Sequence, residues 1–199
     1  MNTYLTPAGM ETSSFNKNEK LQTLENTNTE NNVCQNHFPQ KMFLQNQLEG
    51  YYNIEKAKKS AKIQNKPLFL RFINIRSKNC KKMNAKICKN IRVLEVLNKY
   101  YVVAVLCVSD KEKLSKNEWY HSKYDGKFIR TVGQQNADYQ ITKYFNNIHP
   151  FHVLTGVSDT LLVPPKGFEL DVNNFITFLE NGAKAFIKSE KKEVEEVLK

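Results

Sequence analysis

Hydrophobic and polar positions follow a regular pattern only beyond about residue 48 of this 199-residue chain. The preceding residues are rich in Asn, Gln, Thr and Ser, and their isolated apolar side chains have neither helical nor strand spacing. Such a segment buries too little apolar surface to offset the entropy of ordering it. The pattern therefore predicts a disordered tail or tether over 1–47, followed by a folded domain that begins at 48.

Four segments of the folded part have helical signals. The first is capped by Asn53 and runs to Lys62, and the second begins near Ser77 and is irregular around Lys86. A third covers about 137–145, and a fourth amphipathic helix follows a cap at Asp171. The predicted inward positions of the second helix are Ile87, Ile91, Leu94 and Leu97.

Strand signals alternate with these helices. The segment 68–73 predicts a buried strand, and the near-continuous apolar run at 101–108 is typical of a central strand that is covered on both faces. Two shorter runs, at 151–155 and 160–163, predict an antiparallel hairpin, and Asp-Gly at 125–126 predicts a tight turn. After the first helix the order is β-α-β-α-β-β-α, which indicates an α/β fold with a mixed sheet and helices on both faces.

Composition and charge narrow the function only slightly. The chain has 30 basic and 20 acidic residues, a net charge of +10, which permits an anionic partner without requiring one. Four cysteines are too few for a disulfide-scaffolded mini-protein, and no apolar run is long enough to span a membrane. The first residues also lack the apolar run of a secretory signal, so a complete chain is expected to be cytoplasmic.

Lysines gather on the first two helices, where they could bind nucleic acid. Aromatic residues are not interleaved with them, so solvated helix faces are the favoured interpretation and no nucleic-acid partner is expected. Cys34 and His37 are not matched by a second ligand pair, so we expect no metal and no cofactor. These lysines are Lys56, Lys58, Lys59, Lys62, Lys78, Lys81, Lys82, Lys86 and Lys89.

Several motifs carry a resemblance to one family. A strand, a short loop, a cysteine that opens a helix, and a later residue-Pro pair that leads into a strand form the thioredoxin layout. In chain order, the matching motifs are LEGY (48–51), NKP (65–67), NCKKM (79–83), KYDGK to RTVG (123–133), ADYQI (137–141) and PPKGF (164–168). The chain resembles the C-terminal thioredoxin-like domain of DsbD-type transmembrane thiol:disulfide interchange proteins of Bacteroidetes-like bacteria.

That resemblance covers about 48–188, with a weaker match at 6–11, and leaves 189–199 as a charged helical tail. It implies a thioredoxin-like fold with a sheet of about four or five strands. It also implies a protein-disulfide reductase that takes part in cytochrome c biogenesis, and a periplasmic location if the chain belongs to a longer membrane protein. The implied partners are proteins or peptides with thiol or disulfide groups, and a membrane electron-transfer domain.

In the family, a Cys-x-x-Cys pair at a helix start carries out the exchange. The helix N-terminus lowers the pKa of the first thiol, and the second cysteine resolves the mixed disulfide. The resemblance places the resolving cysteine at Cys80 and a cis-proline at Pro150. We also expect Ile75, Arg76, His149 and Pro150 to bind the substrate, and His152 to be a packed or surface strand residue.

The site departs from the family in three places. Ser77 stands where the family has its nucleophilic cysteine, and a serine hydroxyl cannot act as a thiolate at neutral pH. Arg71 stands where such domains commonly keep a buried Asp, and residues 74–76 replace the usual Gly and aromatic residues. Three changes at one site favour natural divergence over a single introduced mutation.

The four cysteines leave several interpretations open. Cys80 is either a structural remnant or the carrier of residual thiol chemistry, whereas Cys107 is expected in the core of its strand. Cys88 lies eight positions from Cys80, which along one helix is about 12 Å and too far for a disulfide. Cys34 is either inert or brought to Cys80 by a flexible tether.

Two function classes remain from the sequence. The first is a thiol:disulfide interchange protein, or its remnant, with a degenerate Ser-Lys-Asn-Cys site. The second is a catalytically silent thioredoxin-like module that binds extended polypeptides by strand-like pairing.

Overall fold

The computed structural model describes residues 41–42 and 48–197. Within the predicted tail, only Lys41–Met42 falls in this part, and it forms the short strand β1. The rest of that tail, Cys34 included, lies outside the described residues.

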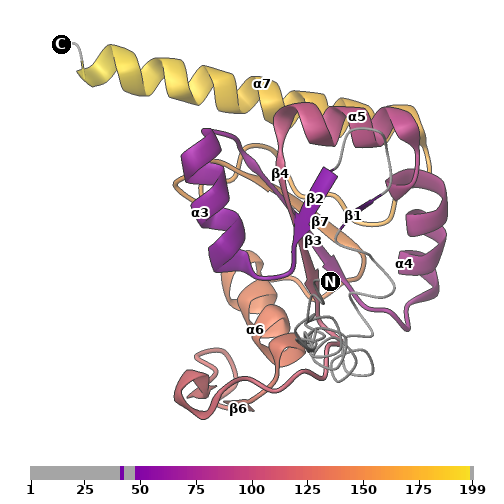
Figure 1. Ribbon diagram of the computed structural model, residues 1–199, viewed down its shortest axis with the longest axis vertical. Helices are drawn as coiled ribbons and strands as arrows, with labels where there is room; N and C mark the ends of the chain where they lie inside the picture. Colours follow the sequence, from indigo (N-terminus) through magenta and orange to yellow (C-terminus); the bar gives the residue numbers. More distant parts are fainter. Residues whose placement is uncertain (1–40, 43–47, 198–199) are drawn as a thin grey trace, which may run out of the picture. The chain divides into compact units, whose positions relative to one another are not determined.

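A five-stranded mixed sheet forms the centre of the domain, in the order β1-β2-β4-β3-β7 (Figure 1). Two of the inner strands, β4 (Val102–Cys107) and β3 (Leu68–Ile73), are parallel to each other and fully buried, as predicted. β2 (Leu48–Tyr51) is parallel to β4, and β7 (Phe151–Thr155) is antiparallel to β3. The α/β class and the mixed sheet are therefore confirmed.

Alternating side chains of the sheet build two separate cores, because successive strand residues point to opposite faces. Leu68, Leu70 and Phe72 of β3 pack with α3 (Ile54–Gln64) and α6 (Val132–Tyr144). Figure 1 shows α3 and α6 away from α4 (Lys78–Met83) and α5 (Ile91–Tyr100). On the second face, Phe69 and Ile73 share a core with α4, α5 and α7 (Val172–Val197).

The second predicted helix is broken in the structure. α4 (Lys78–Met83) continues into a π-helical turn, Asn84–Cys88, and a new helix α5 covers Ile91–Tyr100. The break arises because the side chain of Asn90 caps α5 by accepting from the Arg92 N–H at 3.1 Å. Ile91 then falls on the outside at 47% exposure, so its predicted inward position is wrong, whereas Ile87, Leu94 and Leu97 are buried as predicted.

The third helix begins five residues earlier than its predicted start. α6 starts at Val132 because Thr131 and Gln134 form a reciprocal capping box, in which the Gln134 N–H donates to Thr131 Oγ1 at 3.2 Å. The cap predicted at Asn53 is confirmed, since its Oδ1 accepts from the Lys56 N–H at 3.0 Å. The cap predicted at Asp171 is confirmed too, since its Oδ1 accepts from the Asn174 N–H at 2.8 Å.

The strand predicted over 160–163 does not form. Leu161 makes a single isolated bridge with Thr155, and two prolines follow at 164–165, where no N–H can continue a ladder. The turn predicted at 125–126 is confirmed, since Gly126 has a positive φ of 72° between β5 (Tyr120–His121) and β6 (Phe128–Ile129).

A short 3-10 turn, Lys116–Glu118, lies between β4 and β5. Among the described residues, no helix has the length and apolar character that a membrane crossing needs.

Candidate functional site

The candidate site forms where β3 ends and α4 begins. Ser77 is the N-cap of α4, and its Oγ accepts from the Cys80 N–H at 3.3 Å. The same hydroxyl donates to the main-chain carbonyl of His149 at 3.4 Å. One serine side chain thus joins the loop that precedes α4 to the residue that precedes Pro150.

The His149–Pro150 peptide bond is cis, as expected, and Pro150 is buried directly before β7. The His149 ring is half-buried, and its Nε2 lies 3.0 Å from Gln140 Oε1. Gln140 uses its amide nitrogen to donate to the carbonyl of Ile148 at 3.1 Å, so its oxygen is left to accept from the ring. Neutral His149 therefore carries its proton on Nε2, and Nδ1 is an acceptor.

Burial lowers the pKa of His149, which keeps the ring neutral near pH 7. Within the described residues, the ring bonds to Gln140 and not to Ser77. Among the described residues, no hydrogen bond joins the serine hydroxyl to a side-chain base, so Ser77 and His149 do not form a hydrolase-like pair.

Cys80 is shielded from solvent. Its side chain is 1% exposed, and its Sγ accepts from the Asn74 N–H at 3.5 Å. Cys88 is buried in the same core, and burial raises the pKa of its thiol. Cys80 and Cys88 are free thiols, so they are not joined to each other, whereas Cys107 is buried in β4 and belongs to a disulfide.

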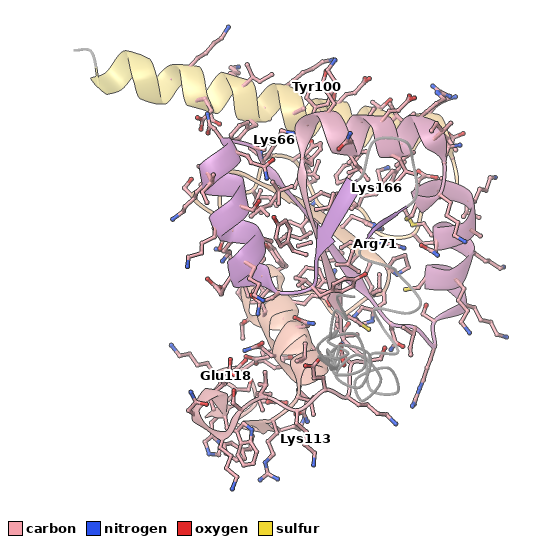
Figure 2. The ribbon with its side chains drawn as sticks, in the orientation of Figure 1. Lys66, Arg71, Tyr100, Lys113, Glu118 and Lys166 are labelled. Carbon is pink, nitrogen blue, oxygen red and sulfur yellow. The ribbon has the colours of Figure 1, made fainter. Side chains whose placement is uncertain are left out.

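A buried cation contacts the residue that directly follows α4. Arg71 of β3 is 2% exposed, pairs in register with His152 of β7, and donates from Nη1 to Asn84 Oδ1 at 3.4 Å. Figure 2 shows its side chain among the strands of the sheet. Burial, and then the charge of Arg71, lower the pKa of His152 to about 3. A guanidinium does not lose its proton near neutral pH, so this position offers no acid or base for thiol chemistry.

The two remaining predicted site residues differ in exposure. Ile75 is half-buried and packs against the core, with its N–H donating to Ser109 Oγ at 3.1 Å. Arg76 is exposed, and its N–H donates to Asn74 Oδ1 at 2.9 Å. Ile75 is thus partly committed to the core, whereas the Arg76 side chain extends toward solvent.

Two exposed apolar residues near the cis-proline were not predicted from the sequence. Ile148 is 51% exposed and Phe168 is 44% exposed. Gly167 lies against Ile148, since a Cβ at Gly167 would stand 3.2 Å from its Cδ1. Ile148 could have been suspected because it directly precedes His149 and Pro150, but nothing in the sequence brings Phe168 to this place.

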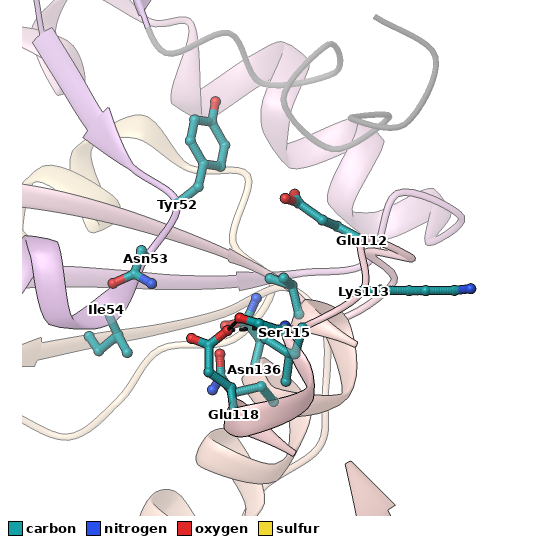
Figure 3. Close-up of a pocket in the computed structure, with 11 residues that line it drawn as sticks. Tyr52, Asn53, Ile54, Glu112, Lys113, Ser115, Glu118 and Asn136 are labelled. Atoms are coloured by element: carbon teal, nitrogen blue, oxygen red, sulfur yellow. Dashed lines mark hydrogen bonds between the residues drawn. The ribbon is translucent and has the colours of Figure 1, made fainter. Parts of the chain in front are cut away.

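A separate cavity of about 260 Å³ opens where β2 and β4 end. Figure 3 shows Ser115, Glu118 and Asn136 grouped on one wall, with Tyr52 and Glu112 apart from them. Its lining is mostly polar and includes neither Ser77 nor Cys80, so it is not part of the candidate site. No group of three or more potential metal ligands occurs among the residues that the structure describes.

Comparison with solved structures defines the class of fold. A DsbH oxidoreductase superposes with a TM-score of 0.53 at 15% identity, covering 67% of this chain and 83% of that one. The oxidised C-terminal domain of DsbD from Neisseria meningitidis gives 0.47 at 12% identity, covering 66% of this chain and 97% of that one. A thioredoxin from Thermus thermophilus gives 0.46 at 16% identity, covering 67% of this chain and 85% of that one.

No family model matches the chain, and no curated protein matches it either. At these identities the likeness concerns the fold alone. The chain has a thioredoxin-like fold, as the sequence motifs implied.

Proposed function

We propose that this chain is a thioredoxin-like protein of the thiol:disulfide interchange kind whose site no longer turns over dithiols. The observation that carries the proposal is the position of Ser77. Its hydroxyl caps α4, binds the Cys80 N–H and reaches the His149 carbonyl, which is where the resemblance puts a nucleophilic thiol.

Disulfide exchange needs two thiols at such a site. The first thiolate attacks a partner's disulfide, forms a mixed disulfide and expels the partner's second sulfur as a thiolate. The resolving thiol then attacks the mixed disulfide and releases the partner in its reduced form. With serine at 77 the first bond cannot form, and the remaining thiol, Cys80, is 1% exposed.

Reduction of insulin disulfides tests this proposal. The purified chain should show no rate above a thiol-free control, whereas Ser77→Cys should gain measurable activity. The gain should be incomplete, because Arg71 occupies the position where a buried carboxylate would move the proton. Wild-type turnover at the rate of a dithiol thioredoxin would contradict the proposal.

A second candidate is a module that binds extended polypeptides without covalent chemistry. The specific observation in its favour is the main chain at His149, a half-buried residue whose carbonyl accepts from Ser77 and whose N–H makes no hydrogen bond within the described residues. A partner's carbonyl could accept from that N–H, and each such bond contributes about 0.5–1.5 kcal/mol net.

Titration of an unfolded polypeptide, followed by chemical shifts, tests this candidate. Shifts should cluster at 74–80 and 148–151 and should persist in reductant, because no disulfide is formed. Shifts confined to the lysines of α3, and abolished by moderate salt, would contradict it.

In both cases the partners are proteins or peptides, with thiol or disulfide groups in the first case. Because a DsbH oxidoreductase shares the fold and the motifs resemble DsbD, the proposed location is the periplasm if this chain is part of a longer membrane protein.

A further inference from the structure

The site lies beside a stretch of chain that carries only positive charge. Between Asn74 and Leu94 there is no Asp or Glu, and every basic side chain in that stretch is exposed. These residues are Arg76, Lys78, Lys81, Lys82, Lys86, Lys89 and Arg92, and we call them the basic ridge. The ridge follows the loop before α4, α4 itself, the π-helical turn and the start of α5.

The charge of the basic ridge is not neutralised within the described residues. None of its members forms an ion pair there, and Arg92 donates to the neutral amide of Asn173 instead. On the opposite face of the sheet, Lys58 and Lys143 both pair with Asp159 at 3.3 Å. Within the described residues, lysine ion pairs therefore form elsewhere, and the ridge is left without acidic partners.

We use the name candidate groove for the surface between residues 74–80 and 148–151, where Ser77 contacts the His149 carbonyl. The basic ridge and the candidate groove share residues of the same loop. Lys78 directly follows Ser77, whose hydroxyl contacts the His149 carbonyl. Beyond His149 stand the exposed side chains of Ile148 and Phe168. A chain segment bound at His149 would therefore be close both to cations of the ridge and to exposed apolar side chains.

This combination favours polypeptide over nucleic acid. No aromatic residue occurs between Asn74 and Leu94, so the ridge has no rings on which bases could stack. An extended polypeptide can instead pair its main chain with His149, place an apolar side chain against Ile148 and Phe168, and direct carboxylates at the ridge.

We propose that the partner of this groove is an acidic, extended polypeptide segment with an apolar residue beside its carboxylates. The inference rests on the proposed function of the groove and adds the chemical class of its partner. The ridge attracts carboxylates through its positive charge, so the preference for an acidic segment weakens when salt screens that charge.

Paired peptides test the proposal on the full chain in reductant. One peptide has a single Leu among Asp and Glu residues, and the second has the same sequence with Asn and Gln in place of every acid. The acidic peptide should bind about tenfold more tightly at low salt, since each exposed ion pair contributes modestly. Both peptides should shift resonances at 148–151.

Two matched variants locate the effect. Lys78→Gln, Lys81→Gln and Lys82→Gln together should remove most of the preference for the acidic peptide. Lys56→Gln, Lys59→Gln and Lys62→Gln on α3 remove the same net charge from exposed positions of another helix and should leave the preference unchanged.

The possible outcomes separate the two proposals. Equal binding of both peptides, with shifts at 148–151, would overturn the acidic partner and leave the groove as proposed. Absence of shifts at 148–151 with either peptide would overturn the groove itself. Tighter binding of single-stranded DNA or of anionic vesicles, equally reduced by both triple variants, would identify a nonspecific electrostatic surface and overturn the acidic partner.

Discussion

Ser77 joins two parts of the site that are far apart in sequence. Its Oγ accepts from Cys80 and donates to His149, so removal of the hydroxyl loses both the helix cap and the link to the cis-proline loop. Ser77→Ala should lower the free energy of unfolding by about 1 kcal/mol, the usual cost of a lost N-cap.

Urea unfolding measures this effect, and Ser77→Asp is the control. An aspartate keeps an acceptor for the Cys80 N–H but cannot donate to the His149 carbonyl. The Ser77→Asp variant should therefore be more stable than the Ser77→Ala variant. Equal stability of wild type and Ser77→Ala would show that the cap contributes nothing.

His152 makes the stability depend on pH. The ring is fully buried between Phe69 and Phe175, at centroid distances of 5.6 and 5.3 Å, and its Nδ1 donates to the Lys166 carbonyl. Burial, and then the charge of Arg71, lower its pKa from 6.5 to about 3. Below pH 6.5 the unfolded state therefore binds a proton that the folded state does not.

The folded state must then lose stability as the pH drops through 6.5, because the unfolded state binds more protons and is favoured at lower pH. Between pH 7 and pH 5, His152 should reduce the free energy of unfolding by about 2 kcal/mol. His149 acts in the same direction, since burial also lowers its pKa. Urea midpoints at the two pH values measure the loss, and His152→Gln should flatten most of it. An unchanged slope in that variant would assign the effect to other groups.

At the scale of elements, the start of α6 requires a glycine. A Cβ at Gly133 would stand 2.6 Å from the main-chain nitrogen of Asp110 and 2.8 Å from the carbonyl oxygen of Val108. Main-chain atoms cannot rotate away, so Gly133→Ala should cost about 2 kcal/mol or more through displacement of α6.

Gly50 in β2 provides the matched control for this change. Its nearest heavy atom would be 3.9 Å from an added Cβ, which is ordinary contact, so Gly50→Ala should be nearly neutral. Thermal unfolding measures the melting temperatures of Gly133→Ala and Gly50→Ala for this comparison. A Gly133→Ala melting temperature equal to that of wild type would mean that α6 does not approach the β4–β5 loop this closely.

Helices and strands could be predicted where the signal lies within their own stretch of sequence. Six consecutive buried residues in each of β3 and β4, and the cap at Asn53, follow directly from the sequence. The break after Cys88 was missed because it depends on the side-chain cap at Asn90. The early start of α6 at Val132 was missed because Val132 and Gly133 are poor helix formers. β2 was missed because four residues are too short for a periodic signal.

At the scale of the whole molecule, the candidate site combines local and tertiary features. Ser77, Cys80 and Pro150 could be placed from motifs, because their spacing along the chain carries the resemblance. The contact between Gln140 and His149 and the exposure of Phe168 could not, because they depend on how α6 and the segment after β7 pack on the sheet.

We propose that Ser77 and Cys80 occupy the positions of a reactive thiol pair that has lost its first sulfur. The most direct measurement is peptide mapping of Ser77→Cys after mild oxidation. A disulfide between the introduced sulfur and Cys80 should form, with loss of one hydrogen from each thiol to the added oxidant, because one turn at a helix start brings such a pair together. An introduced thiol that stays free, or that pairs with Cys88 instead, would show that residues 77 and 80 do not occupy the positions of such a pair.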